Sequence, residues 1–371
     1  MSARIKPPFR ADHVGSLLRP AELAEARAKA KRGEITVDAL RAVQDKCIRE
    51  AVARQEATGI QAITDGEFRR DWWHVDFLSG FGGVDSRPDP GVANFKGLGT
   101  EDLPPIMSVT GKVRRVKPVF LDHFKFLKSI TTKTPKMTVP APAMLHHRGG
   151  YPSISKEAYP DRAQFWVDVG RAYSEEIRDF HAAGCNYLQI DDTSYSMLCD
   201  ANFREMVKKR GDNPDELVHT YANAINLAIA NRPAGMTVTM HTCRGNFQSS
   251  WVAEGGYEAV AETVFNEVKV DGFFLEYDSE RAGGFEPLRF MPKDKIVVLG
   301  LITTKLAALE AKDMLRRRIE EATKYVPLEN LCLSPQCGFA STYHGNKVTA
   351  EDQWRKLELV VEVAREVWGG A

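Results

Sequence analysis

The chain has 371 residues, of which 50 are basic and 50 are acidic, so its formal net charge is zero. This balance argues against nucleic acid as a partner, and no stretch approaches the ~18 consecutive apolar residues of a membrane helix. The N-terminal residues lack the apolar core of a signal peptide, so we expect a cytoplasmic protein whose six cysteines are free thiols.

Short apolar runs alternate along the chain with longer segments whose apolar residues recur at helical spacing, as at Phe165, Val169 and Tyr173. The apolar runs predict strands that end near Ser16, Asp65, Pro140, Asp191, His241, Glu276, Ile302 and Cys337. The longer segments predict helices over residues 21–32, 37–58, 162–183, 215–230, 257–267, 306–324 and 350–367. We expect Asp215 and Thr349 to cap two of these helices.

Eight strands joined by helices predict an α/β fold, a (β/α)8 TIM barrel that takes up the whole chain, 1–371, as a single domain. The C-terminal ends of the strands in such a barrel share one mouth, where catalytic residues lie. Polar residues stand at or just beyond the predicted strand ends, namely His13, Ser16, Asp65, Glu67, Asp191, Asp192, His241, Cys243, Glu276, Lys305 and Cys337. An open doubly wound sheet would usually carry a glycine-rich phosphate turn, which this sequence lacks.

Residues 79–135 interrupt this alternation between the second and third predicted strands. Glycines and prolines, as in Gly80-Phe-Gly-Gly83 and Leu103-Pro-Pro105, indicate loops, whereas residues 107–119 alternate like a strand. We therefore predict an insertion or arm at 79–135 within the barrel, and we regard it as a candidate contact surface for a homodimer.

The most specific pattern is His241-Thr-Cys243 at the end of an apolar, β-branched run. Side chains at i and i+2 of a strand point to the same side, so the imidazole and the thiol emerge together. Glu276 and Cys337 end two other predicted strands, and the four side chains form a complete tetrahedral zinc set. A cysteine taken alone is usually a small buried hydrophobe, and a lone histidine is more often hydrogen-bonded than metal-bound. A structural zinc is the alternative to a catalytic one.

The composition of this ligand set favours one kind of chemistry. Thiolate ligands donate charge to zinc and lower its strength as a Lewis acid, which disfavours hydrolysis. A substrate thiol would still bind as a thiolate, because zinc strongly depresses the pKa of thiols. The set therefore predicts alkyl transfer to a zinc-bound thiol.

Other residues at the predicted mouth suit a small zwitterionic substrate. Glu67 and Asp191 can hold an ammonium group, and Ser16 can donate a hydrogen bond to a carboxylate. The alternative for Glu67 is a solvated turn with surface ion pairs. The alternative for Asp191 is a carboxylate at a helix N-terminus.

Together these motifs resemble those of the cobalamin-independent methionine synthase family, in order and over nearly the whole chain. His241-x-Cys243, Glu276 and Cys337-Gly338 resemble its zinc ligands. The segments that resemble its substrate motifs are Arg10-x-Asp12-His13-Val14-Gly15-Ser16, Asp65-Gly66-Glu67 and Leu188-Gln-Ile-Asp191. The resemblance implies a zinc-bearing barrel that methylates homocysteine to methionine.

The resemblance also implies roles for individual residues. Ser16, Glu67 and Asp191 would bind the amino-acid end of homocysteine, and Glu276 would leave the zinc when the substrate sulfur arrives. We assign His13 to the same substrate site, and we assign Lys305, together with Glu67 and Asp191, to catalysis.

Two departures from the family pattern bear on the methyl donor. Full-length synthases carry a second barrel that helps to bind the polyglutamate tail of methylfolate, whereas this chain has room for one barrel. The family's catalytic histidine after the seventh strand is replaced by Gly300-Leu-Ile-Thr-Thr-Lys305, which makes Lys305 the candidate at that place. A corrinoid carrier protein or a small methylated compound then becomes the alternative donor.

Two other functions stay open at this point. The short, single-barrel branch also resembles zinc enzymes that open an epoxide with a thiol, which applies the same nucleophile to another electrophile. A non-catalytic barrel that binds zinc or a thiol would carry the same ligand set but would show no alkyl turnover.

Overall fold

The computed structural model describes residues 4–89, 91, 95–96 and 103–371. Within these residues, six parallel strands form the main sheet, and strands that are neighbours in the sheet also follow one another in the sequence. In order across the sheet they are β5 (Met137–Pro140), β6 (Tyr187–Asp192), β7 (Thr237–Thr242), β8 (Gly272–Glu276), β9 (Ile296–Ile302) and β10 (Leu331–Pro335).

Shorter segments close this sheet into a barrel. Two of them are the strands β1 (Ala62–Ile63) and β4 (Thr134–Pro135). They pair in parallel, and the chain runs from β4 into β5. On the other side the Asp12 amide donates to the Leu333 carbonyl oxygen of β10 at 3.0 Å, and the Leu17 amide donates to the Gly66 carbonyl oxygen beyond β1 at 3.0 Å. These contacts confirm the predicted (β/α)8 TIM barrel, although its first strand is reduced to an isolated bridge at Ala11.

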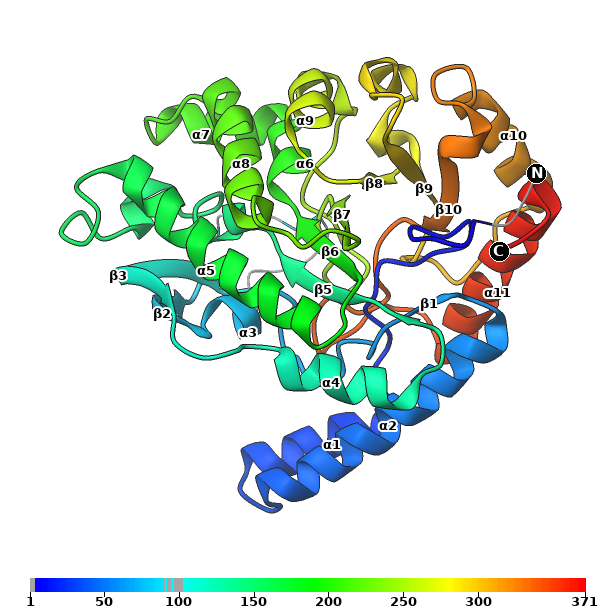
Figure 1. Ribbon diagram of the computed structural model, residues 1–371, viewed down its shortest axis with the longest axis horizontal. Coiled ribbons are helices and arrows are strands. Elements are labelled where there is room, and N and C mark those ends of the chain that lie inside the picture. The colour runs from blue at the N-terminus through cyan, green and yellow to red at the C-terminus, as the bar shows by residue number, and fades with distance from the viewer. Residues whose placement is uncertain (1–3, 90, 92–94, 97–102) are drawn as a thin grey trace.

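Helices cover the outside of the barrel (Figure 1); all but the last of them connect strands, and the last follows β10. They are α2 (Val37–Thr58), α4 (Leu121–Ile130), α5 (Arg162–Ala182), α8 (Pro214–Ile229), α9 (Ala261–Glu267), α10 (Lys312–Ala322) and α11 (Ala350–Trp368). In addition, α1 (Ala21–Lys31) packs against α2 as a helical hairpin at the edge of the molecule. No helix in the described part of the chain is both long and apolar enough to span a membrane.

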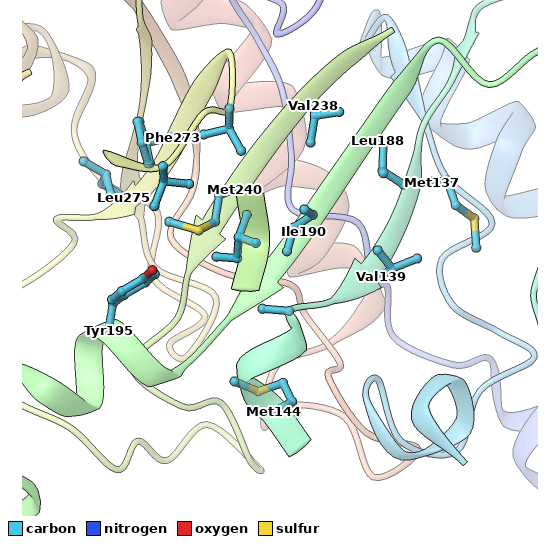
Figure 2. Packing of buried hydrophobic residues seen from close by; sticks show 14 of the residues in the cluster. Met137, Val139, Met144, Leu188, Ile190, Tyr195, Val238, Met240, Phe273 and Leu275 are labelled. Atoms are coloured by element: carbon cyan, nitrogen blue, oxygen red, sulfur yellow. The ribbon is translucent and has the colours of Figure 1, made fainter. Parts of the chain in front are cut away.

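Alternation along the strands separates the two faces of the barrel wall. On β5 to β8, every second residue is apolar and packs in the core shared with the helices (Figure 2). These residues are Met137, Val139, Leu188, Ile190, Val238, Met240, Phe273 and Leu275. The side chains between them point into the barrel, and they include Asp191, His241 and Glu276. The register places Asp191 beside His241, so the polar residues come to one level at the mouth.

Some predicted helix boundaries are wrong. α10 begins at Lys312 instead of 306, because residues 303–311 form a loop in which the Thr303 amide donates to the Glu310 carboxylate at 2.8 Å. The sequence predictions also lack α6 (Ser194–Leu198) and α7 (Ala201–Lys209), two short helices in the connection after β6.

Helix capping follows the local sequence at one of the two predicted sites. Thr349 caps α11 and forms a capping box with Asp352, as predicted. The N-cap of α8 is Asn213 instead of Asp215, because Pro214 takes the first helical position.

The segment 79–135 holds a β-hairpin and parts of the barrel wall. β2 (Phe81–Arg87) pairs antiparallel with β3 (Ile106–Arg115) beside the short helix α3 (Val75–Leu78), and α4 and β4 follow. Parts of the connection between β2 and β3 lie outside the described residues. The Lys96 amide donates to the Trp251 carbonyl oxygen at 2.9 Å, which brings this connection to the loop after β7. A role of the segment in a homodimer stays a prediction.

Candidate active site

Four side chains from three strand ends converge at the mouth of the barrel. His241 lies in β7, Cys243 follows that strand, Glu276 ends β8 and Cys337 follows β10. One nitrogen, sulfur or oxygen atom of each side chain lies within 4.8 Å of those of the others, and all four residues are buried. The structure therefore brings the four predicted metal ligands together.

The distance between the two thiols suits a shared metal ion. Cys243 Sγ and Cys337 Sγ are 3.3 Å apart. A disulfide requires about 2.05 Å, whereas two thiolates on a tetrahedral zinc, each about 2.3 Å from the metal, would lie about 3.8 Å apart. The hydrogen bond from the Cys243 thiol and the nearby His241 imidazole lower the pKa of Cys337 well below its usual value. One sulfur is thus favoured as a thiolate, the form that binds zinc.

The nitrogen and oxygen donors of the cluster also fit a cation. Among the described residues, neither ring nitrogen of His241 has an oxygen or nitrogen partner, and Glu276 Oε2 accepts no hydrogen bond. Gln336 Nε2 donates to the other oxygen, Glu276 Oε1, at 3.0 Å, and Arg281 stands 3.8 Å from Oε2. Burial and the neighbouring Cys337 raise the pKa of Glu276. A metal ion between these donors would satisfy the buried atoms that are otherwise unpaired.

A cavity opens on this cluster. Its walls include His241, Cys243 and Cys337, and also the predicted substrate residues Ser16, Glu67 and Asp191. Its apolar side is formed by Val14, Trp73, Phe95, Pro104, Met144, Met197 and Val252. The cavity thus combines sulfur and nitrogen donors, two carboxylates and an apolar wall, which is typical of a site for a small organic substrate.

Glu67 is held in a strained backbone conformation. Its φ of 62° is in the left-handed region although it carries a side chain. Thr138 Oγ1 donates to Glu67 Oε1 at 2.9 Å and Arg70 stands 3.4 Å from the same oxygen, whereas Oε2 has no hydrogen-bond partner among the described residues. Burial raises the pKa of the Glu67 carboxyl.

Asp191 points into the same cavity from β6. Gln189 Nε2 donates to Asp191 Oδ1 at 2.6 Å. Burial raises the pKa of Asp191 to about 7, and the neighbouring His241 opposes this shift. Asp191 has no ion-pair partner among the described residues, and Glu67 keeps Oε2 unpaired beside its ion pair with Arg70, so an ammonium group would stabilise the ionised forms of both carboxyls.

Ser16 lies against the loop that carries Cys337. A Cβ atom on Gly338 would lie 1.9 Å from Ser16 Oγ, so only glycine at 338 allows the two segments to approach this closely. The Phe339 amide donates to the Ser16 carbonyl oxygen at 2.9 Å. The serine hydroxyl is thereby held at the edge of the metal-ligand cluster.

Two predicted site residues lie apart from the cavity. His13 Nε2 is 3.0 Å from the Ala62 carbonyl oxygen, and burial lowers its pKa to about 4. Lys305 is buried, and its Nζ donates to Asn246 Oδ1 at 2.9 Å and to the carbonyl oxygens of Gly245 and Ser250. Neither residue lines the cavity. Lys305 instead fixes the loop after β7, of which Asn246 lines the cavity.

Among the polar residues of the cavity wall, three with ionisable side chains are absent from the sequence predictions. They are His74, which precedes α3, and His147 and Arg148, which follow η1 (Pro142–Leu145) beyond β5. His147 and Arg148 come after the strand end predicted near Pro140, and the other polar candidates were chosen because they also follow predicted strand ends. Their position could therefore have identified them from the sequence. For His74 the sequence offered no comparable signal.

Comparison with known proteins places the chain in a family. Residues 9–366 match the family described as cobalamin-independent synthase, catalytic domain. The chain belongs to this family. It is 48% identical to YxjG of Bacillus subtilis (strain 168) over 369 residues. The match covers 98% of this chain and 96% of YxjG. A methionine synthase from Saccharolobus solfataricus is 24% identical over 361 residues, 92% of this chain and 95% of that protein.

A solved structure extends this comparison. A protein from Listeria monocytogenes, assigned as a vitamin-B12-independent methionine synthase, superimposes with a TM-score of 0.77. It is 39% identical, and the match covers 98% of both chains. Family membership and the barrel with its polar mouth together identify the chain as a methionine synthase-like methyltransferase.

Proposed function

We propose that the protein is a zinc-dependent methyltransferase that methylates a small thiol, with homocysteine as the leading acceptor. The observation that supports this proposal best is the buried cluster of His241, Cys243, Glu276 and Cys337, of which His241, Cys243 and Cys337 line a cavity. These four side chains would hold the zinc. When bound there, zinc would keep the acceptor sulfur as a nucleophilic thiolate near neutral pH.

The residues around the cluster would bind the rest of the acceptor. Glu67 and Asp191 would take the ammonium group, because both carboxyls line the cavity, burial raises the pKa of each, and Glu67 Oε2 is left unpaired by its contacts with Thr138 and Arg70. The hydroxyl of Ser16 would donate to the carboxylate of the acceptor. Such contacts would orient the sulfur toward the methyl group. Holding the two reacting atoms in this geometry lowers the entropic cost of reaching the transition state.

Lys305 would position the loop after β7 and would not contact the substrate itself. Its three acceptors lie in the loop that follows Cys243, and one of them, Asn246, also lines the cavity. The buried ammonium would hold this loop against the mouth and would balance part of the negative charge of the ligand set.

The test of the metal site is zinc content. We expect close to one zinc per chain in the purified protein, and we expect Cys243→Ser and Cys337→Ser to lose both the metal and methyl transfer, because serine is a poor zinc ligand. Cys199→Ser is the matched control, since this free thiol lies outside the cluster. Full zinc occupancy in both cluster variants would contradict the proposed ligand set.

A further inference from the structure

Gln336 contacts one of the proposed metal ligands and precedes another, but the proposed function gives it no part. It stands directly before Cys337 in the loop after β10, and its side chain is fully buried. Its Nε2 atom donates a hydrogen bond to Glu276 Oε1 at 3.0 Å. Gln336 does not line the cavity, so any effect on the reaction must pass through the neighbouring metal ligands.

The orientation of the Gln336 side-chain amide is fixed by Thr304. The backbone amide and the hydroxyl of Thr304 both donate to Gln336 Oε1, at 3.2 Å and 2.6 Å. Because a backbone N–H can only donate, the amide oxygen must face Thr304 and the amide NH2 group must face Glu276. The Thr304 carbonyl oxygen in turn accepts from Asn346 Nδ2 at 2.9 Å, and all four residues are buried.

The two oxygens of the Glu276 carboxylate therefore have different surroundings. Oε1 accepts the hydrogen bond from Gln336, whereas Oε2 accepts none from the described residues. The guanidinium of Arg281 lies 3.8 Å from Oε2 and also pairs with Asp278 at 2.8 Å. Oε2 is thus the oxygen left for a metal ion, and the bond to Oε1 opposes a turn of the carboxylate toward a closer ion pair with Arg281.

We infer that Gln336 is a positioning residue that holds Glu276 with Oε2 toward the metal ion, and that Thr304 holds Gln336 in turn. This inference rests on the proposed function. Hydrogen-bond partners of metal-ligating side chains typically contribute about ten- to a hundredfold to metal affinity. Gln336 would make this contribution through Glu276, without contact to the metal or to the substrate.

Zinc affinity of the full chain tests the inference with two variants. Zinc is removed and then titrated back in competition with a chelating dye, which gives the dissociation constant. Gln336→Met keeps the length of the side chain but cannot donate to Glu276. Thr304→Val keeps the shape of the threonine but removes the hydroxyl that fixes the amide.

Gln353→Met is the matched control for the loss of a buried amide. Gln353 lies on α11, is buried, accepts from the Leu18 backbone amide at 2.7 Å and does not line the cavity. We expect Gln336→Met to raise the zinc dissociation constant at least about tenfold and Thr304→Val to raise it about threefold or more. The control should leave the zinc dissociation constant unchanged.

A background without the Glu276 carboxylate separates positioning from general damage to the site. Each substitution is repeated in the Glu276→Ala protein, where the group to be positioned is absent. If Gln336 acts through Glu276, its substitution should then change the zinc dissociation constant by less than about twofold. A purely structural role for Gln336 would give the same loss of affinity in both backgrounds.

The outcomes separate this inference from the proposed function. Wild-type zinc affinity in Gln336→Met, or an equal loss with and without the Glu276 carboxylate, would overturn the positioning role. Unchanged affinity in Thr304→Val would remove Thr304 from it. If Gln336→Met does not fold, the comparison of Thr304→Val in the two backgrounds decides in the same way. A wild-type protein that takes up no zinc would instead overturn the proposed function.

Discussion

Glu67 combines backbone strain with a buried carboxylate. A left-handed conformation at a residue with a side chain costs roughly 1–3 kcal/mol, and the burial that raises the pKa of this carboxyl is a further cost to the fold. Thr138 and Arg70 contact only Oε1. Both costs are expected if Glu67 Oε2, which has no partner among the described residues, binds a cationic group of the substrate.

Glu67→Gln and Asp191→Asn should weaken homocysteine binding. Each removes a charged acceptor, which is worth roughly 1.5–3 kcal/mol, or about ten- to a hundredfold in the dissociation constant. The measurement is a titration with homocysteine and, in parallel, with mercaptobutyrate, which has the same chain but no amino group.

The second thiol makes this prediction specific. The variants should bind mercaptobutyrate as well as the wild type does, and Glu25→Gln, an exposed change on α1, should alter neither titration. An equal loss of affinity for both thiols would remove Glu67 and Asp191 from the ammonium site.

At the scale of the strand, the alternation of side chains along β5 to β8 places apolar residues in the core and polar residues at the metal-ligand cluster. The sequence predicted His241, Cys243, Glu276 and Asp191 at one mouth, because alternation and strand ends are local features. The loops that cover the mouth depend on tertiary contacts, such as that of Lys96 with the loop after β7, and no local pattern encodes these. The cavity-wall residues His74 and His147 therefore emerged only from the structure.

The loop after β9 supports the loop after β7 through Lys305. Lys305→Met should lower the free energy of unfolding by about 2–4 kcal/mol, because it leaves the buried acceptors of Gly245, Asn246 and Ser250 without a donor. It should also lower kcat/KM, since Asn246 lines the cavity. Denaturant unfolding and steady-state kinetics measure the two effects.

An exposed lysine provides the comparison. Lys208→Met, on α7, should change neither quantity appreciably. A Lys305→Met protein that is destabilised but keeps its kcat/KM would restrict Lys305 to a structural role. A protein unchanged in both would contradict the assigned contacts.

At the scale of the whole molecule, the chain forms one barrel, and its closure brings together segments from both halves of the sequence. Alternating strands and helices were sufficient to predict this fold. The course of the β2–β3 hairpin was not predictable in the same way, because only its alternation and its loop residues are visible in the sequence.

The charges on the cavity wall bear on the methyl donor. We predict that the protein alone uses methylfolate polyglutamate poorly, because Arg148 is already paired and the other described lining residues include no lysine or arginine to hold an anionic tail. The assay is steady-state methionine formation from that donor and homocysteine. Efficient turnover without an added carrier protein would refute this prediction.

The central claim is that the cluster of His241, Cys243, Glu276 and Cys337 presents a metal ion to the sulfur of a thiol acceptor. The most direct measurement replaces zinc by cobalt and follows the absorption spectrum as homocysteine is added. We predict growth of sulfur-to-cobalt charge-transfer absorption that saturates at one homocysteine per metal. A spectrum that homocysteine leaves unchanged would contradict the claim.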